Sequence, residues 1–187
     1  MEKHNIVATL IFAAFASVAV ADHHKTGSEQ TATVKEFEEL RDRLNGRWLS
    51  DLKVNILWPK LGVKKGGTTT IFADYDADLD GMVFGGERKL GHIKWKQTFH
   101  YDAGKSVIVA NCVGSNGFWS QEHWWKISEY EFGKKFQGGQ RDGSTFSGSA
   151  TWTFSADGKT VTSVSADVKQ GDSDESQGPI VWKKISN

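Results

Sequence analysis

From Ser28 onward, the spacing of apolar residues along the chain changes once, near residue 45. Before that point, apolar side chains recur every three or four positions, which is typical of one face of an α-helix. Thr33 and Glu36 fit a capping box at its start, and Gly46 stands where a C-terminal cap would. We therefore expect one helix of about three turns within Ser28–Asn45, lying across one end of the remaining structure. Its apolar stripe is Val34, Phe37, Leu40 and Leu44.

After Gly46 the apolar residues alternate with a period of two, which is typical of strands with one buried face. Turn-forming dipeptides such as Asp80-Gly81, Asn116-Gly117 and Asp157-Gly158 separate the stretches, because glycine and asparagine accept positive φ angles. Ten short strands in one domain predict an antiparallel barrel or sandwich. The expected strands are Arg47–Leu57, Thr68–Tyr75, Met82–Leu90, His92–Tyr101, Ser106–Val113, Phe118–Ile127, Tyr130–Phe136, Thr145–Phe154, Thr160–Val168 and Pro179–Ile185.

Residues 1–21 have the layout of a secretory signal peptide. A polar start with Lys3 precedes the apolar run Ile6–Ala21, and Ala19-Val20-Ala21 supplies the small residues of a cleavage site. This run is shorter than the roughly 20 residues of a membrane-spanning helix. We expect a periplasmic or secreted protein without stable membrane insertion after processing. Residues 22–30 would form a flexible tail and residues 31–187 a single β-barrel domain.

The charge balance and the cysteine content limit which partners we expect and which interactions can stabilise the fold. The 23 Lys and Arg residues balance 23 Asp and Glu residues, so the formal net charge is zero. Nucleic-acid-binding domains usually carry a basic excess, and we expect no nucleic-acid partner. Cys112 is the only cysteine, which excludes an internal disulfide. Packing must therefore stabilise the fold, and eight tryptophans can supply it.

The middle of the chain predicts an inner wall, because alternate residues of a strand face opposite sides. The odd positions of His92–Tyr101 are mostly apolar, so that face is expected inside. We expect Tyr101 to pair with Ser106, and a two-residue turn within Ser115–Gly117 to follow the next strand. Such a wall of aromatic and polar side chains is typical of a small-molecule pocket; the alternative is a filled core in which the polar groups satisfy each other. The candidate ligand-binding residues are Trp95, Gln97, Phe99, Trp119, Gln121, His123 and Trp125, with Ile108, Ala110 and Cys112 between them.

Asn45-Gly46-Arg47-Trp48, a Gly-x-Trp that opens the first strand after a short helix, resembles the start of lipocalin and calycin barrels. The whole mature chain is similar to a family of uncharacterised bacterial exported proteins with a lipocalin-like fold, in the stretches His100–Lys105 and Thr151–Lys159. The resemblance implies an all-β, antiparallel up-and-down barrel of about 8–10 strands, lipocalin-like, with one N-terminal helix. The last strand carries Lys183 and Lys184, where lipocalins have an arginine that stacks on the tryptophan.

Two stretches have metal-ligand spacing. Asp76, Asp78, Asp80 and Glu87 match positions one, three, five and twelve of a calcium loop. Their flanks favour strands, and the alternative is a solvated hairpin turn. Cleavage after Ala21 would expose Asp22-His23-His24, and an amine with histidine third can chelate copper(II). The alternative there is a flexible tail. Calcium is the one cofactor considered, and no other is predicted.

Catalytic groupings are sparse, and no catalytic residue is assigned. Glu122 and His123 point to opposite faces of a strand. Cys112 and His123 can share the interior as a Cys-His pair, although a buried cysteine usually serves packing. Three functions remain open. The first is an exported lipocalin-like protein that binds a small, largely apolar ligand in the barrel. The others are a barrel hydrolase or isomerase using His123, and a structural envelope protein with a filled barrel and no ligand.

Overall fold

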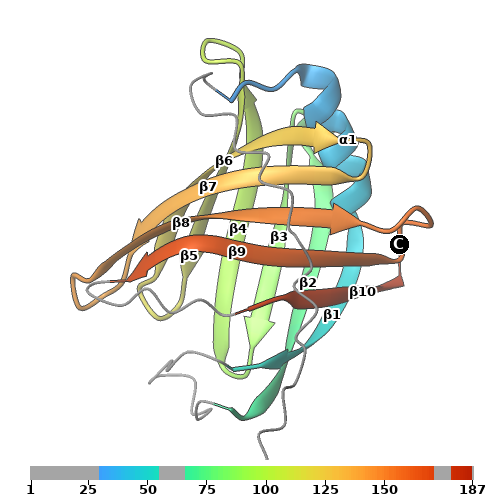
Figure 1. Ribbon diagram of the computed structural model, residues 1–187. Helices are drawn as coiled ribbons and strands as arrows, with labels where there is room; N and C mark the ends of the chain where they lie inside the picture. The colour runs from blue at the N-terminus through green and yellow to red at the C-terminus, as the bar shows by residue number, and fades with distance from the viewer. Residues whose placement is uncertain (1–29, 55–65, 171–177, 187) are drawn as a thin grey trace, which may run out of the picture.

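The protein is a closed barrel of ten antiparallel strands in chain order, with β1 paired to β10 (Figure 1). The computed structural model describes residues 30–54, 66–170 and 178–186. This architecture confirms the predicted up-and-down barrel with one N-terminal helix. The elements are α1 (Val34–Leu44), β1 (Gly46–Lys53), β2 (Thr68–Asp78), the 3-10 turn η1 (Leu79–Gly81), β3 (Val83–Leu90), β4 (Ile93–Asp102), β5 (Val107–Gly114), β6 (Trp119–Ser128), β7 (Glu131–Gly139), β8 (Thr145–Phe154), β9 (Thr160–Gln170) and β10 (Ile180–Ser186).

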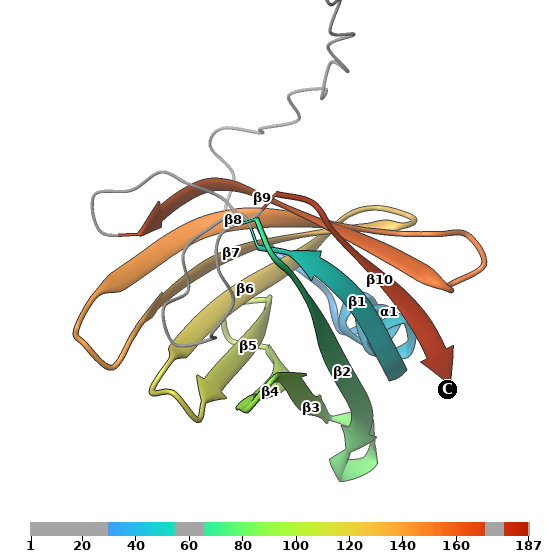
Figure 2. The same ribbon diagram turned by 90° about the horizontal axis from the view of Figure 1, so that it is seen from below.

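Helix α1 begins at the predicted capping box. The backbone N–H of Glu36 donates to Thr33 Oγ1 at 3.2 Å, and the backbone N–H of Thr33 donates to Glu36 Oε2 at 2.7 Å. These bonds satisfy amides that a helix start leaves free. The helix ends at Asn45, and Gly46 takes a φ of 106° that favours glycine. Figure 2, viewed from below, shows α1 behind β1 and β10.

The buried face of α1 closes one end of the barrel. Its buried residues are Phe37, Leu40 and Leu44. Phe37 packs against Phe84 of β3 with ring centroids 5.5 Å apart, and Phe84 stacks on Phe99 of β4 at 4.2 Å. The helix therefore joins the apolar core that fills this half of the barrel. Other core members are Trp48, Ile108, Trp124, Phe132, Trp152, Phe154, Val161 and Trp182.

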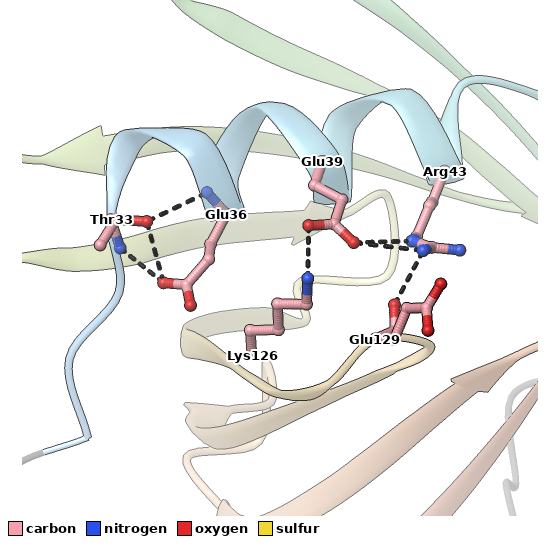
Figure 3. Close-up of polar contacts among 6 residues, drawn as sticks. All are labelled: Thr33, Glu36, Glu39, Arg43, Lys126 and Glu129. Atoms are coloured by element: carbon pink, nitrogen blue, oxygen red, sulfur yellow. Dashed lines mark hydrogen bonds and ion pairs between the residues drawn. The ribbon is translucent and has the colours of Figure 1, made fainter.

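Polar contacts fix α1 to the hairpin between β6 and β7 (Figure 3). Lys126 Nζ lies 2.6 Å from Glu39 Oε2, and Arg43 Nη2 lies 3.1 Å from Glu39 Oε1. Arg43 also donates to the backbone carbonyl of Glu129 at 2.8 Å. Partial burial raises the pKa of Glu39, but the hydrogen bonds from Lys126 and Arg43 outweigh it and hold that pKa below its ordinary value.

Candidate functional site

The three candidate residues of β4 face the barrel interior as predicted. Gln97 and Phe99 are buried, and Trp95 on the same face is half-buried. The partner strand is shifted by two positions from the expected register, because Asp102 pairs with Val107 and the four-residue loop begins at Ala103, one residue later than expected. Phe99 therefore lies opposite Ala110 and not Ile108, while Gln97 lies opposite Cys112. A shift of two leaves every side chain on its predicted face.

The predicted faces of β6 are wrong. The turn after β5 has three residues, Ser115 to Gly117, because the amide of Gly114 bonds the carbonyl of Phe118 at 2.7 Å. Gly117 supplies the left-handed position of this loop with a φ of 84°. One residue more than the expected two-residue turn moves each β6 side chain to the other face. Ser120, Glu122 and Trp124 consequently point inward, and the outward residues are Trp119, Gln121, His123 and Trp125.

The four outward residues do not contribute to an interior site. Trp119 is 49% exposed and lies against Gly139 of β7. Trp125 covers Gly133 in the same way, so each indole fills the space above a glycine on the neighbouring strand. His123 is exposed, lies opposite Val109 and Lys135, and has no acid or nucleophile bonded to it among the described residues. Cys112 faces inward, so the Cys112–His123 pair is not formed.

The inward face of the central strands carries a band of polar side chains, of which alternation predicted Gln97 and Cys112. We call this band the polar layer. The phenol of Tyr75 donates to Gln97 Oε1 at 3.0 Å, and Gln97 Nε2 donates to Glu122 Oε2 at 2.9 Å. Lys134 Nζ lies 3.0 Å from Glu122 Oε1. Each strand from β2 to β7 contributes one member: Tyr75, Arg88, Gln97, Cys112, Glu122 and Lys134.

Glu122 is the best-satisfied member of the polar layer. Its carboxylate accepts from Lys134, from Gln97 and from the indole N–H of Trp124, the last at 2.9 Å. Burial raises the pKa of Glu122, but these contacts outweigh it and hold the pKa below its ordinary value. Burial lowers the pKa of Lys134, and the positive charge of Arg88 adds to this effect, although Glu122 opposes both. Burial also raises the pKa of Tyr75 to about 12, so its phenol stays protonated as a donor.

Arg88 is the least satisfied member. Its Nη2 donates to Cys112 Sγ at 3.5 Å, a weak acceptor, and its buried Nε has no hydrogen-bond partner. Arg88 shares its strand face with the buried Phe84 and Leu90, so its side chain points into the barrel. The residue as a whole is nevertheless only half-buried, although its Nε is buried.

The end of the barrel away from α1 is lined by inward aromatic side chains that stay partly exposed. Phe118 stacks on Phe146 with centroids 5.1 Å apart, and Phe136 lies 6.2 Å from Phe146. Trp95 lies beside them in the same half of the barrel, next to Gly114. These side chains point inward and keep part of their surface accessible to solvent. We call the four residues Trp95, Phe118, Phe136 and Phe146 the mouth.

The half of the barrel next to α1 is solid by comparison. It contains a cavity of about 10 Å3, lined by Leu44, Trp48, Ala73, Tyr75, Trp152, Val161 and Trp182. That volume is about enough for one water molecule. Small-molecule pockets usually have roughly 300 Å3 or more. The filled-core alternative therefore describes this half.

The acidic turn between β2 and β3 does not form a calcium loop. Asp76 and Asp78 bond the amides of the residues that follow them, Ala77 and Leu79. Glu87 lies along β3 opposite Asp74 and forms an ion pair with Lys89 at 3.4 Å, away from the turn. Strands flank the turn in place of helices, so Glu87 cannot fold back onto Asp76, Asp78 and Asp80. Within residues 30–54, 66–170 and 178–186, no group of three His, Cys, Asp or Glu side chains is placed to hold a metal ion. Asp22, His23 and His24 lie outside the described residues.

The chain was compared with protein-family models and with curated proteins. No protein-family model matches the chain, and no curated protein matches it. Among the described residues, no helix has the length and apolar character needed to cross a bilayer.

Proposed function

We propose that this chain is an exported, lipocalin-like protein that binds a small, largely apolar ligand at the mouth of its barrel, above the polar layer. The observation that carries the proposal is the partial exposure of Trp95, Phe118, Phe136 and Phe146 on an inward face. Aromatic rings left accessible inside a closed sheet offer an apolar ligand a concave surface. The leader at residues 1–21 supports export, and the Gly-x-Trp at Gly46 to Trp48 supports the lipocalin-like family.

The mouth can supply both affinity and orientation. Each aromatic side chain offers up to 150–250 Å2 of surface, and burial of apolar area contributes about 25 cal/mol per Å2. Gln97 and Glu122 already bond each other beneath the mouth, so they form a fixed polar floor. A ligand that lies on this floor would keep its apolar body against the rings. Of the residues proposed from sequence, Trp95 and Gln97 remain in this site, whereas Phe99 is buried in the core beside α1.

The structural alternative has one observation in its favour, the solid core beside α1. A protein with that core and an unused mouth would have no ligand. The hydrolase or isomerase alternative has less support, because His123 lies on the outer surface. A ligand-binding assay therefore separates the leading proposal from the structural alternative.

Two tryptophans at the same end of the barrel give a matched test. Trp95 faces inward, and Trp119 faces outward. We expect the mature chain to bind N-phenyl-1-naphthylamine with enhanced dye fluorescence. Trp95→Ala should weaken binding several-fold, and Trp119→Ala should leave it unchanged. Native mass spectrometry of the protein purified from its own compartment should show a bound mass. Absence of dye binding and of a bound mass would leave the structural alternative.

A further inference from the structure

Beyond an apolar ligand, the geometry points to a ligand whose head group is an oxyanion, held by the guanidinium of Arg88. This inference rests on the proposed function, since it names the chemical class of the ligand at the mouth. We propose that a carboxylate or phosphate group of a small amphiphile binds Arg88, with its apolar body on the rings of the mouth. Three features of the structure support this proposal: the charge of the polar layer, the free donors of Arg88, and the position of Arg88 beside Trp95.

The polar layer carries more positive than negative charge. Its cationic side chains are Arg88 and Lys134, and its one carboxylate is Glu122. Glu122 already accepts from Lys134 at Oε1 and from Gln97 and Trp124 at Oε2. None of its hydrogen bonds goes to Arg88. The guanidinium is charged at all ordinary pH values, so one positive charge inside the barrel has no ionic partner among the described residues.

Arg88 also has unused donors. A guanidinium has five N–H groups, and the one hydrogen bond that Arg88 makes within the described part of the chain is to Cys112 Sγ at 3.5 Å. Its Nε is buried and has no acceptor there. Buried donors are nearly always satisfied, and a charged one is especially costly to leave bare. The planar fork of an arginine matches the two oxygens of a carboxylate or phosphate, which would satisfy these donors together.

The position of Arg88 suits an amphiphile. In the register of β3 and β4, Arg88 lies directly opposite Trp95, and both face inward. Gly114 lies beyond Trp95 on β5 and leaves space for its indole, because a Cβ there would lie 2.7 Å from the ring. Arg88 is thus next to the mouth and half-buried as a residue, so an anionic group that enters beside Trp95 would meet its free donors. The apolar part of the same molecule would lie on Phe118, Phe136 and Phe146.

The test compares head groups on one apolar chain. The mature protein is titrated with decanoate, decyl phosphate, decanol and decylamine below their micelle concentrations, in competition with N-phenyl-1-naphthylamine. We expect decanoate or decyl phosphate to bind about ten- to hundredfold more tightly than decanol, and decylamine to bind most weakly. The ratio of decanoate to decyl phosphate distinguishes the two oxyanions. Arg88→Gln should reduce the preference over decanol to less than about threefold, while decanol still binds.

Lys89→Gln is the matched control, since Lys89 is the next residue, exposed, and on the outer face. It should keep the full head-group preference. Arg88→Lys keeps the charge without the fork and should give an intermediate preference. Equal binding of decanoate and decanol by the wild-type protein overturns the inference and leaves the proposed function intact. Failure of every probe, the dye included, overturns the proposed function itself. The wild-type head-group series decides the matter even if Arg88→Gln does not fold.

Discussion

Lys134 lies 3.0 Å from Glu122 inside the barrel, and both side chains are 10% exposed or less. The ammonium is also within 4.9 Å of the Trp124 ring centroid and 5.7 Å of that of Trp152. Aromatic faces attract a cation, so the rings replace part of the water that Lys134 loses. The pair stands between the solid core and the mouth.

Removing one partner of this pair should be strongly destabilising. Lys134→Met leaves the buried carboxylate of Glu122 without its counter-ion, and Glu122→Gln leaves the ammonium unpaired. We expect each to lower the free energy of unfolding by about 3–5 kcal/mol, measured by urea denaturation. The double variant should lose less than the sum, because it leaves no bare charge. Lys135→Met on the outer face is the control, with an effect within about 0.5 kcal/mol. Strictly additive losses would contradict the coupling.

Acid should destabilise the protein through Glu122 and Glu39. Both carboxyls have a pKa below the ordinary 4.5 in the folded state. Between the folded and the unfolded pKa, the unfolded chain binds more protons, so stability rises with pH there. The contribution is complete above pH 4.5 and is lost as pH falls through the lowered pKa values. The melting temperature of the wild type should fall below pH 4.5, and less steeply in Glu122→Gln. If the melting temperatures of the wild type and Glu122→Gln fell equally steeply with pH, Glu122 would not be a source of the acid sensitivity.

Gly117 should be the most sensitive glycine of the turns. Its φ is 84°, and a Cβ would lie 2.7 Å from Arg141 Cβ. Gly143 has nearly the same φ, 85°, with open space around it. Gly143→Ala should cost about 1–2 kcal/mol of unfolding free energy from backbone strain alone. Gly117→Ala should cost measurably more by chemical denaturation. Equal losses would show that the neighbouring loop moves aside freely.

Calcium should not stabilise the protein through the acidic turn. Asp76 and Asp78 are occupied by backbone amides, and Glu87 lies away from them on β3. We expect the melting temperature to be the same in several millimolar calcium and in a chelator. A rise with calcium that disappears in Asp78→Asn would contradict this and would restore the calcium site. The copper site at Asp22, His23 and His24 stays a prediction, testable by copper(II) absorption of the processed chain.

The sequence alone was sufficient to predict the helix and the strands and their order along the chain. Capping residues and Gly-containing turns are local signals, and they located α1 and all ten strands within a few residues. The faces of β6 could not be found in this way. Its tryptophans lie on both faces, Trp119 and Trp125 on one and Trp124 on the other, so alternation does not identify the buried face. Which face of β6 is buried depends on the length of the preceding turn, and one residue more or less reverses the two faces.

The charged members of the polar layer were missed for a different reason. Charged side chains are not expected inside a barrel, because burial of a charge is costly. One local signal was present: Phe132 and Phe136 share a strand face, and Lys134 between them must point the same way. Its partner Glu122 comes from β6, whose faces were reversed. The partnership itself is a tertiary contact that no local pattern contains.

Trp48 and Lys184 face each other where the first strand meets the last, and the ammonium lies 5.1 Å from the indole centroid. This seam joins residues from opposite ends of the chain. It closes only after the last strand has formed, which makes the fold dependent on long-range contacts and slow for its size. A chain truncated before Ile180 would keep β1 and β9 as two free edges, and free edges promote aggregation. The integrity of the barrel thus depends on β10.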